Sequence, residues 1–522
     1  MSKEFNDVGN CIPERHFMAD ISAKLDAILP LIEEGKYFTI NRPRQYGKTT
    51  IQDMLWRRLR ESSEYAAINI SFEKIDHDCF KSTAAFTDAF LLQLADYAEE
   101  TEDHDLEAAL EKHKGIGDFS RLSRFITDLT RDKKIVLMID EVDTSSNNQL
   151  FLDFLALLRD KYLKRNQGRG ATFQSVILAG VHDVKNLRLK IRPGDELRYN
   201  SPWNIAVDFD VDLSLHPEEI ASMLQDYSAE RGVSMDISAI AERLFFHTSG
   251  YPFLTSRLCK IMDEKMDLGS KWRLEHVDQA AALILKDRNT NFESLIKNLE
   301  NNEALYRLTQ AILLDGVELT VDEDIPGVAD GIMYGVFRSN GRIIIHNRVY
   351  EQRIYNYMTG KLRVGELIDG TFNNYTHRDN YLNADGRLNL ERVLLKFQEF
   401  MGKEYSNRDE KFYEREGRLI FLAFLRPIIN GHGFDFKEPQ ISEEKRLDIV
   451  VVYRDEKYVI ELKIWRGPKL HEKGLAQLGD YLDRQGLSRG YLASFDFNKK
   501  DSRKGESEWI RDQGKEIFAV WV

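Results

Sequence analysis

A lysine and two threonines directly follow a glycine near the start of the chain, where a β-prone run gives way to a helical pattern. The run Tyr37–Ile40 leads into a polar loop, and the helical pattern starts at Ile51. A strand, a loop and a helix in that order present backbone N–H groups and a helix N-terminus to a polyphosphate. In such a loop Lys48 reaches the β- and γ-phosphates, and the Thr49 hydroxyl coordinates Mg²⁺. The residues expected to bind the nucleotide are Arg44, Gln45, Tyr46, Gly47, Lys48, Thr49 and Thr50.

Two adjacent carboxylates end an apolar run further along the chain and strengthen this interpretation. The run Lys134–Glu141 is typical of a buried strand, and its last residues are Asp140 and Glu141. Asp140 is placed to hold the hydration shell of Mg²⁺, and Glu141 to orient or deprotonate the attacking water. The loop alone is also compatible with a basic turn that caps a helix, because Arg42 stands where a glycine is usual. Together the two motifs predict a site for ATP and Mg²⁺.

A second set of charged residues lies near the C-terminal end. Two β-rich runs flank a short polar turn and predict a hairpin, Leu447–Tyr453 and Lys457–Trp465. Side chains alternate between the faces of a strand, so Glu461 and Lys463 share one face, and a turn centred on residues 455–456 adds Asp448 opposite Lys463. Asp448 and Glu461 can hold a divalent ion, and Lys463 can orient or deprotonate a bound water. A solvated ion pair on an exposed hairpin face is the alternative.

The elements that must position these residues fall into several parts. Between Asp20 and Asp210, helical stretches alternate with β-rich runs and predict a parallel α/β sheet covered on both faces; the runs are Tyr37–Asn41, Ala66–Phe72, Ile135–Asp140, Ser175–Gly180 and Ile205–Phe209. A helical region follows, then two helical stretches around short β-prone pieces, which indicate a winged helix, and finally a separate α/β unit. The expected boundaries are 1–212, 213–290, 291–365, a polar linker at 366–388, and 389–522.

Composition and charge limit the classes of protein to consider. No window approaches 18 uncharged apolar residues, and the first residues lack the apolar core of a signal peptide, so a cytoplasmic protein without a membrane span is expected. The three cysteines are far apart, which excludes a disulfide framework and a zinc finger. The net charge of −13 argues against a protein that coats nucleic acid, but it does not exclude basic residues confined to one cleft.

The N-terminal motifs resemble those of the bacterial AAA-like ATPases, a group near the STAND and archaeal-type ATPases. In that family an Arg-Pro-rich loop without the first glycine is normal, and the resemblance extends over roughly residues 1–360 through the stretches 176–183, 201–205 and 248–253. It implies a P-loop sheet with a helical lid, in which the turn Gly250-Tyr251-Pro252 lies near the nucleotide. His182 is the nearest candidate for a sensor, although a loop histidine without a nucleotide contact is the favoured alternative. Candidates for an arginine finger are Arg192, Arg198 and Arg257.

The C-terminal motifs resemble the PD-(D/E)XK nuclease superfamily over about residues 390–520. A helix, then a hairpin with Asp448 and Glu461-Leu462-Lys463, then a crossing helix with Gln477 and Tyr481 occur in the order of that superfamily. Glu416, favoured over Glu414, matches the position of its supporting acidic residue. The resemblance implies a restriction-endonuclease-like α/β domain that uses Mg²⁺, with Mn²⁺ as an alternative.

Together the two resemblances imply an ATPase joined to a metal-dependent nuclease whose cutting is gated or assembled by nucleotide. The expected partner is nucleic acid, DNA rather than RNA, and a nucleotide-dependent homo-oligomer is a further hypothesis. By analogy alone, such a fusion suggests defence against foreign DNA. The main alternative is a STAND-like signalling or assembly ATPase whose C-terminal domain binds nucleic acid without cutting. A DNA-binding regulator built on segment 291–362 is the weakest alternative, because that segment lacks an evident basic recognition helix.

Overall fold

The computed structural model of this chain divides into two compact units. One comprises residues 1–305 and 320–350, and the other comprises residues 306–319 and 351–522. The structure describes residues 2–522 except for residues 114, 145–147, 182–201, 267, 314–318, 321, 323–324, 340, 369–380, 384, 405–419, 423, 426–427, 430–432, 437–448, 454–455, 466, 485 and 497–501. Within the described part, no helix is long and apolar enough to cross a membrane.

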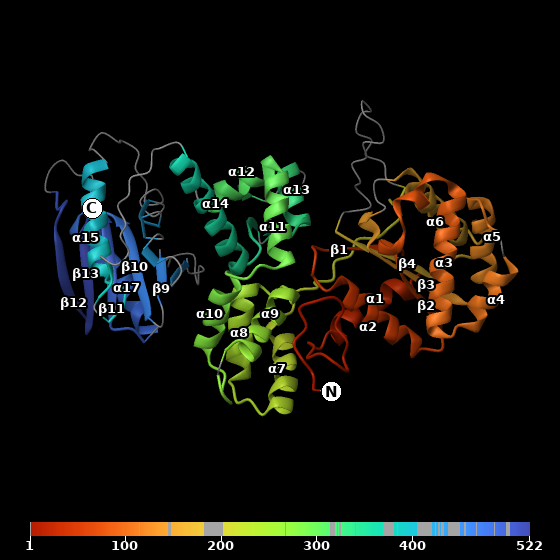
Figure 1. Cartoon of the computed structure of the whole chain (residues 1–522), viewed down its shortest axis with the longest axis horizontal. Helices are drawn as coiled ribbons and strands as arrows, with labels where there is room; N and C mark the ends of the chain where they lie inside the picture. The colour runs from red at the N-terminus through yellow and green to blue at the C-terminus, as the bar shows by residue number, and fades with distance from the viewer. Residues whose placement is uncertain are drawn as a thin grey trace. The chain divides into compact units, whose positions relative to one another are not determined.

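A four-stranded parallel sheet lies at the centre of the N-terminal region (Figure 1). Its strand order is β1-β4-β3-β2, with bounds Phe38–Asn41, Ser175–Gly180, Lys134–Asp140 and Tyr65–Ser71. The observed strands agree with four of the five expected runs to within a residue or so at each end. The carboxyl ends of all four strands meet at one edge of the sheet, and this edge is where a ligand site of an open α/β sheet is expected.

The expected fifth strand, Ile205–Phe209, was wrong as a full strand. Only an isolated bridge between Val207 and Phe38 is present, on the free edge of β1. The carbonyls of Phe209 and Val211 accept hydrogen bonds from the Arg42 guanidinium, at 3.4 and 2.8 Å, instead of joining a ladder. The arginine side chain therefore takes over the bonding that would have extended the strand.

Helices cover both faces of this sheet. Side chains alternate along each strand, so Ile135, Leu137 and Ile139 face a core that includes residues of α3, α5 and α6. The helices α1 and α2 lie on the other side of the sheet from α6 (Figure 1). The bounds of these helices and of the small α4 are α1 Ser22–Glu33, α2 Lys48–Arg60, α3 Thr83–Thr101, α4 His104–Lys112, α5 Phe119–Leu129 and α6 Gln149–Asn166. Three short 3₁₀ helices accompany them, η1 Phe72–Lys74, η2 His77–Lys81 and η3 Val142–Thr144.

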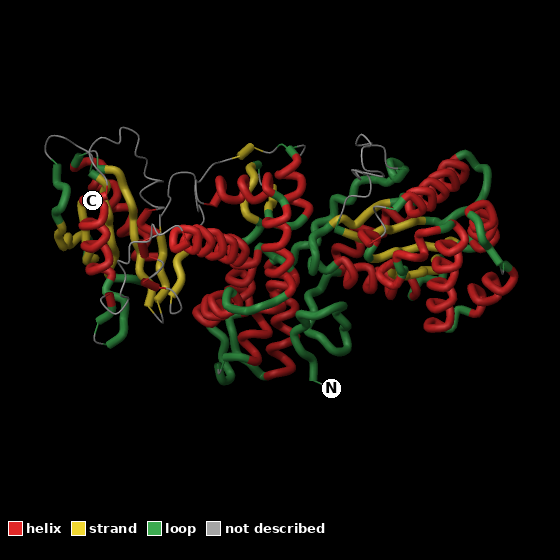
Figure 2. Tube along the Cα trace, turned by 45° about the horizontal axis from the view of Figure 1, so that its top comes forward, coloured by secondary structure: helices red, strands yellow, loops and turns green. Residues whose placement is uncertain are grey.

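A helical region follows the sheet and then passes into a mixed segment, visible as red and yellow tubes in Figure 2. The helices are α7 Pro217–Arg231, α8 Ile237–Thr248, α9 Pro252–Glu264 and α10 Leu274–Ile284. The mixed segment contains α11 Thr290–Asn301, α12 Glu303–Leu313, β5 Leu319–Thr320, α13 Pro326–Met333, β6 Phe337–Ser339, β7 Arg342–Ile345 and α14 Arg348–Ile368. The strands β6 and β7 pair as an antiparallel hairpin.

A six-stranded mixed sheet forms the core of the C-terminal unit. Its order is β12-β13-β11-β10-β9-β8, and β10, β11 and β13 run parallel to one another. The bounds are β8 Gly433–Phe436, β9 Ile449–Tyr453, β10 Glu456–Ile464, β11 Arg489–Phe495, β12 Ser507–Asp512 and β13 Lys515–Trp521. The helix α17, Pro468–Arg484, connects β10 to β11 and packs through Leu475, Leu478 and Leu482 on one face. The helix α15, Leu390–Glu404, also lies in this unit.

Candidate functional site

The loop between β1 and α2 has the backbone that a phosphate-binding loop needs. Gly47 has φ of +80°, in the left-handed region that favours glycine, and α2 starts at the next residue. A Cβ atom at Gly47 would lie 3.7 Å from Pro252 at the start of α9. The N–H groups of the first turn of α2 therefore point out of a tight loop, which is the geometry that binds an anion.

Lys48 is buried beneath this loop. Its ammonium donates hydrogen bonds to the carbonyls of Arg42 and Pro43, each at 3.0 Å. Burial lowers the pKa of Lys48, while the nearby carboxylates of Glu141 and Asp140 act in the opposite direction. The loop thus curls around its own lysine and holds the positive charge at the edge of the sheet where β3 also ends.

Thr49 and Asp140, the two residues expected to hold Mg²⁺, are brought together. The Thr49 hydroxyl donates a hydrogen bond of 2.6 Å to Oδ2 of Asp140, which ends the adjacent strand β3. A hydroxyl and a carboxylate oxygen are hard donors of the kind that Mg²⁺ prefers, with waters and phosphate oxygens completing its shell. The donor set therefore fits Mg²⁺ bound together with a nucleotide.

Glu141 directly follows Asp140 but has a different environment. Its φ is +55°, and its backbone N–H donates to Oδ1 of Asp140 at 2.9 Å. Partial burial raises the pKa of the Glu141 carboxyl, and the negative charge of Asp140 adds to this effect. A carboxylate with a raised pKa is a better proton acceptor near neutral pH than an ordinary glutamate. These features suit a general base for an attacking water.

The remaining loop residues contact elements outside the sheet. Tyr46 has its hydroxyl 2.7 Å from the Ser214 hydroxyl and 3.2 Å from Nε2 of His346. Gln45 donates to the Thr290 hydroxyl at 3.3 Å. Among the loop residues expected to bind the nucleotide, Gln45 and Tyr46 therefore touch residues 213–290, the region expected to form the lid, and the segment that follows it.

Thr50 and Arg44 likewise contact neighbouring segments. The Thr50 hydroxyl accepts a hydrogen bond from the backbone N–H of Cys11 at 3.3 Å. The carbonyl of Arg44 accepts a hydrogen bond from the Tyr251 hydroxyl, in the Gly250-Tyr251-Pro252 turn. This turn lies against the loop, in the place that the sequence suggested for it.

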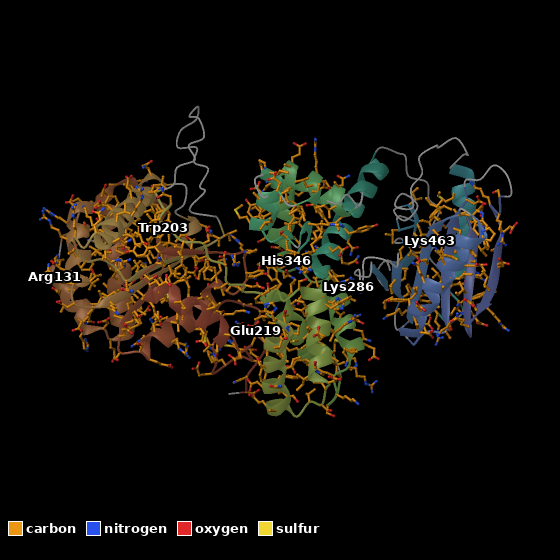
Figure 3. The ribbon with its side chains drawn as sticks, turned by 180° about the vertical axis from the view of Figure 1, so that it is seen from behind. Arg131, Trp203, Glu219, Lys286, His346 and Lys463 are labelled. Carbon is orange, nitrogen blue, oxygen red and sulfur yellow. The ribbon has the colours of Figure 1, made fainter. Side chains whose placement is uncertain are left out.

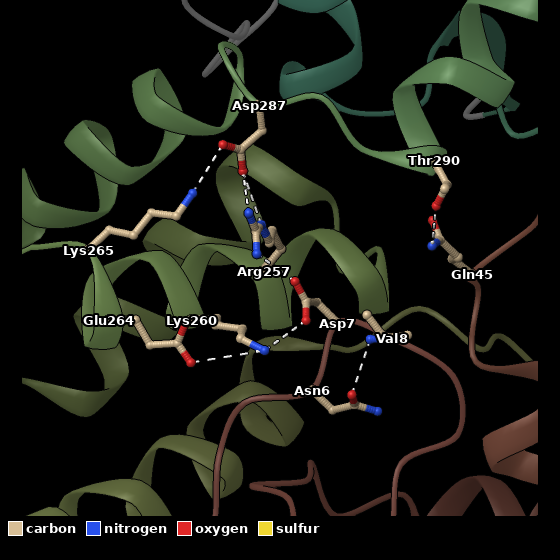
Figure 4. A network of polar contacts seen from close by, with 10 residues as sticks. All are labelled: Asn6, Asp7, Val8, Gln45, Arg257, Lys260, Glu264, Lys265, Asp287 and Thr290. Atoms are coloured by element: carbon tan, nitrogen blue, oxygen red, sulfur yellow. Dashed lines mark hydrogen bonds and ion pairs between the residues drawn. The ribbon is translucent and has the colours of Figure 1, made fainter.

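Arg257, one candidate for an arginine finger, is held inside the first unit by two carboxylates. Figure 4 shows its guanidinium between Asp7 and Asp287, each at 2.5 Å. Lys260 on the same helix binds Asp7 at 2.9 Å. Arg257 therefore ties the N-terminal segment to α9. The other candidates, Arg192 and Arg198, and the sensor candidate His182 lie outside the described residues.

In the C-terminal unit, Glu461 and Lys463 both lie on the central strand β10, and Figure 3 labels Lys463 there. Glu461 has no solvent-exposed surface, and its Oε1 lies 2.9 Å from the ammonium of Lys463. The exposed hairpin face with a solvated ion pair is therefore wrong as a description of this site. The predicted partners Asp448 and Glu416 lie outside the described residues. Within the described ranges, no group of three or more His, Cys, Asp or Glu side chains is arranged to hold a metal ion.

The register of the hairpin differs slightly from the expected one. Glu456 pairs with Tyr453 and Ile460 with Ile449, so every partner on β9 lies two residues before the expected one. A shift of two residues keeps each side chain on its face of the sheet, because side chains alternate with a period of two. Glu461 and Lys463 share one face because they lie two residues apart on β10.

The helix α17 covers this face and carries the expected Gln477 and Tyr481. Tyr481 is buried with Val450 and Val459 in the apolar cluster between the helix and the sheet, and Gln477 is partly exposed. Residues four apart share one helical face, so Gln477 and Tyr481 lie one turn apart along α17. The helix thus closes the Glu461 side of the sheet with apolar contacts rather than leaving it open to water.

The sequence model of a protein family described as "AAA-like domain" matches residues 19–325, more than half of the chain. The chain belongs to this family. The matched range contains the loop after β1, the two carboxylates after β3 and the helices α7–α11. The first unit therefore carries a P-loop domain of the AAA-like ATPases, while the six-stranded C-terminal sheet lies beyond the matched residues.

No curated protein matches the chain. Among solved structures, it is similar to a Walker-type ATPase of Pyrococcus abyssi, with 11% identity and a TM-score of 0.44 over 67% of this chain and 99% of the other. It is also similar to the RuvB Holliday junction branch migration motor of Thermotoga maritima, with 15% identity, a TM-score of 0.33, and coverage of 66% and 95%. Cdc6p of Pyrobaculum aerophilum follows, with 14% identity, a TM-score of 0.29, and coverage of 64% and 93%.

Two contributions to the AAA-like domain escaped the sequence reasoning. Arg42, in the place of the missing glycine, bonds the backbone that leads from the sheet to the lid. Asp143 accepts a hydrogen bond from the N–H of Val181 at 2.6 Å, and a Cβ at Gly180 would lie 2.9 Å from its carboxylate. It therefore joins the carboxyl ends of β3 and β4. In the sequence, these two roles could have been suspected only from Arg42 at a position where glycine is usual and from Gly180 at the end of a buried strand.

Trp203 lies in the stretch 201–205, one of the stretches that resemble the AAA-like ATPases. Its indole N–H donates to the Thr39 hydroxyl at 3.0 Å, and its ring stacks on Tyr37 at 5.8 Å. The side chain is fully buried beside β1 of the AAA-like domain, and Figure 3 labels it. Trp203 therefore anchors the chain to the edge of the sheet, close to the single bridge that replaces the fifth strand.

Proposed function

We propose that this protein is a divalent-metal-dependent nuclease, acting on DNA, whose cutting is gated or assembled by ATP at the AAA-like domain. The arrangement of Lys48, Thr49, Asp140 and Glu141 supports ATP binding and hydrolysis. The C-terminal sheet would supply the cutting site. In this proposal the contacts between the phosphate-binding loop and the lid transmit the difference between bound ATP and bound ADP to the rest of the protein.

The observation that carries the nuclease proposal is the Glu461–Lys463 pair. Burying a carboxylate on a central strand is costly, because its hydration is lost and ion pairing offsets that loss only in part. Replacement of a buried ion pair by apolar residues of similar volume is often neutral or stabilising. The charges therefore support a chemical role, and their positions agree with the order expected for a PD-(D/E)XK nuclease.

In this mechanism the carboxylates of Glu461 and Asp448 would hold the metal ion, and Glu416 would support them. The ion, when bound, stabilises the negative charge that develops on the phosphodiester. Lys463 orients the attacking water through its ammonium, which Glu461 fixes at 2.9 Å. Gln477 and Tyr481 are proposed to contact the phosphate side of the site from α17. Mg²⁺ is the expected ion, and Mn²⁺ is the alternative.

The test is cleavage of linear, circular and single-stranded DNA and of RNA, with Mg²⁺ or Mn²⁺, in the presence and absence of ATP. Lys463→Ala and Glu461→Gln are each expected to lower cutting by about 10²-fold or more, because each removes a group that stabilises charge in the transition state. Lys457→Ala is the matched control, since Lys457 lies on the same strand and face at the end of the hairpin. Lys48→Ala is expected to remove the effect of ATP while leaving the cutting site intact.

Two outcomes would contradict this proposal. ATP hydrolysis without cutting of any substrate would contradict the nuclease and favour a signalling or assembly ATPase whose C-terminal unit binds nucleic acid. Cutting that persists in Lys463→Ala would place the chemistry elsewhere.

A further inference from the structure

A histidine on α17 lies over the same part of the sheet as Lys463. The His471 ring stacks on Trp521 with centroids 5.1 Å apart and meets the edge of Trp465 at 5.2 Å. Both ring nitrogens are buried, and neither has a hydrogen-bond partner among the residues that the structure describes. Burying two ring nitrogens without hydrogen-bond partners lowers stability. If this position only required an aromatic ring, a residue without polar ring atoms would be more favourable.

The sheet register places polar side chains directly beneath this ring. Lys463 of β10 pairs with Ser494 of β11, which pairs in turn with Trp521 of β13. These three residues therefore form one row across the sheet. The neighbouring row, which contains Glu461, pairs it with Leu492. His471 thus lies above the row that contains the lysine of the proposed cutting site.

The histidine and the lysine both line a small cavity. Its volume is about 10 Å³, and its lining also includes Ser494 and Gly474. A cavity of this size is close to what one water molecule needs, provided that the water has two or more polar partners. A Cβ at Gly474 would approach Lys463 Cγ to 3.6 Å, so a larger residue there would crowd the space beside the lysine.

We propose that His471 is a positioning residue for Lys463, acting through one water molecule held in this cavity. The inference rests on the proposed nuclease function. The cavity water accepts a hydrogen bond from the ammonium of Lys463, which also contacts Glu461. The cavity water donates a hydrogen bond to a ring nitrogen of His471.

The surroundings of the ring agree with this role. Burial lowers the pKa of His471, and the positive charge of Arg503 acts in the same direction. The imidazole is therefore neutral at physiological pH and keeps one nitrogen that accepts a hydrogen bond. A phenylalanine would satisfy the stacking on Trp465 and Trp521 but would offer no acceptor to the water.

The first test compares His471→Phe with His471→Gln in the full chain. His471→Phe keeps an aromatic ring between the two tryptophans, so its melting temperature is expected to stay within a few degrees of the wild type. Its kcat for DNA cleavage is expected to fall about 10- to 100-fold with little change in KM, because a misplaced catalytic group slows the chemical step. His471→Gln retains an acceptor and is expected to recover most of the rate. Cleavage by His471→Phe at the wild-type rate would overturn the inference, as would equal losses in both variants.

The second test does not depend on cutting. A crystal structure of the full chain is expected to show one ordered water within hydrogen-bond distance of Lys463 Nζ and a ring nitrogen of His471, and to lose that water in His471→Phe. An empty cavity, or a direct contact between the two side chains, would overturn the inference whatever the cleavage result. A wild-type protein that binds the water but cuts nothing would contradict the nuclease proposal and leave the water-mediated contact established.

Discussion

Asp140 and Glu141 are neighbours in the chain, yet their surroundings assign them different tasks. Asp140 accepts the short hydrogen bond from Thr49 and ends a buried strand. Glu141 turns away with a positive φ, and burial together with the charge of Asp140 raises its pKa. One carboxylate is thus suited to the Mg²⁺ shell and the other to accepting a proton.

Glu141→Gln is expected to retain ATP binding and to lower the hydrolysis rate by about 10²- to 10⁴-fold, the usual contribution of a general base. Its amide keeps the shape of the side chain but cannot take a proton. The measurements are steady-state phosphate release and nucleotide titration calorimetry. Glu73→Gln is the control, since Glu73 lies at the neighbouring strand end and its charge contributes only weakly to the pKa of Glu141. Wild-type turnover in Glu141→Gln would assign the base to another residue.

At the scale of elements, Gly250 shows how closely the lid turn packs. It has φ of +72°, and its carbonyl accepts a hydrogen bond from the N–H of Leu215 at 2.8 Å. A Cβ atom there would lie 2.3 Å from the Leu215 carbonyl oxygen. Gly232 at the end of α7 has a similar φ of +67°, but no heavy atom lies within 4 Å of its Cβ position.

Gly250→Ala is therefore expected to lower the melting temperature much more than Gly232→Ala does. The control substitution carries only the cost of the left-handed backbone, about 1–2 kcal/mol. Gly250→Ala carries that cost and also a collision with backbone atoms that cannot rotate away. Thermal unfolding of both variants, with and without ATP, makes the comparison. Equal shifts would show that the turn moves freely away from Leu215.

An ion-pair cluster joins α8 to α10 within the lid. The Arg243 guanidinium binds both oxygens of Asp278 at 2.7 and 2.9 Å, and His247 lies 2.8 Å from the same carboxylate. Burial alone would raise the pKa of Asp278, but the hydrogen bonds from His247 and Arg243 outweigh it and lower the pKa to about 2. The ordinary value is about 3.9, so the charged carboxylate stabilises the folded lid.

The sign of the pH dependence follows from the lowered pKa. The stabilisation by Asp278 is complete above about pH 4 and is lost as the pH falls through about 2, and it amounts to about 2 kcal/mol. Asp278→Asn is expected to weaken the protection of α8 amides against hydrogen exchange at pH 7. The difference in protection between the variant and the wild type should disappear as the pH falls towards 2. Asp226→Asn, which removes an exposed partner of Lys3, is expected to change little. A gap that stays constant with pH would show that shape, not charge, holds the helices together.

At the scale of the whole molecule, the loop after β1 is a junction of several segments. Its residues contact the N-terminal segment through Thr50 and Cys11, the lid through Tyr251, and the hairpin segment through His346. Phosphates bound at Lys48 would therefore lie next to contacts that reach three parts of the first unit. A change of nucleotide can shift the lid only if the two nucleotides interact differently with its alternative positions.

Nucleotide-dependent assembly is expected if these contacts regulate the protein. The mass in solution should increase with a non-hydrolysable ATP analogue and return to that of the smaller species with ADP. Lys48→Ala is the control and is expected to keep one mass under all conditions. Mass photometry or light scattering at micromolar concentration provides the measurement. An invariant mass with both nucleotides would contradict assembly and leave gating within one chain.

The sequence by itself determined the local parts of the site. The strand Ser175–Gly180 has the bounds that its apolar run predicts. Lys48, Thr49 and Asp140 can be predicted as site residues because their expected chemistry depends on neighbours within a few positions and on the order of parallel strands. Such patterns involve residues that are close in the sequence, so they can be recognised without knowing how the chain packs.

The tertiary structure decided what depends on residues far apart in the chain. It showed that the arginine in the glycine position, Arg42, bonds the backbone at 209–211, and that Arg257 is held by Asp7 and Asp287. It also showed that α17 covers the Glu461 face, which the alternation along β10 could not reveal. Burial and ion pairing arise when segments that are distant in the sequence pack together. A local sequence pattern does not reveal which distant segment will contact a given residue.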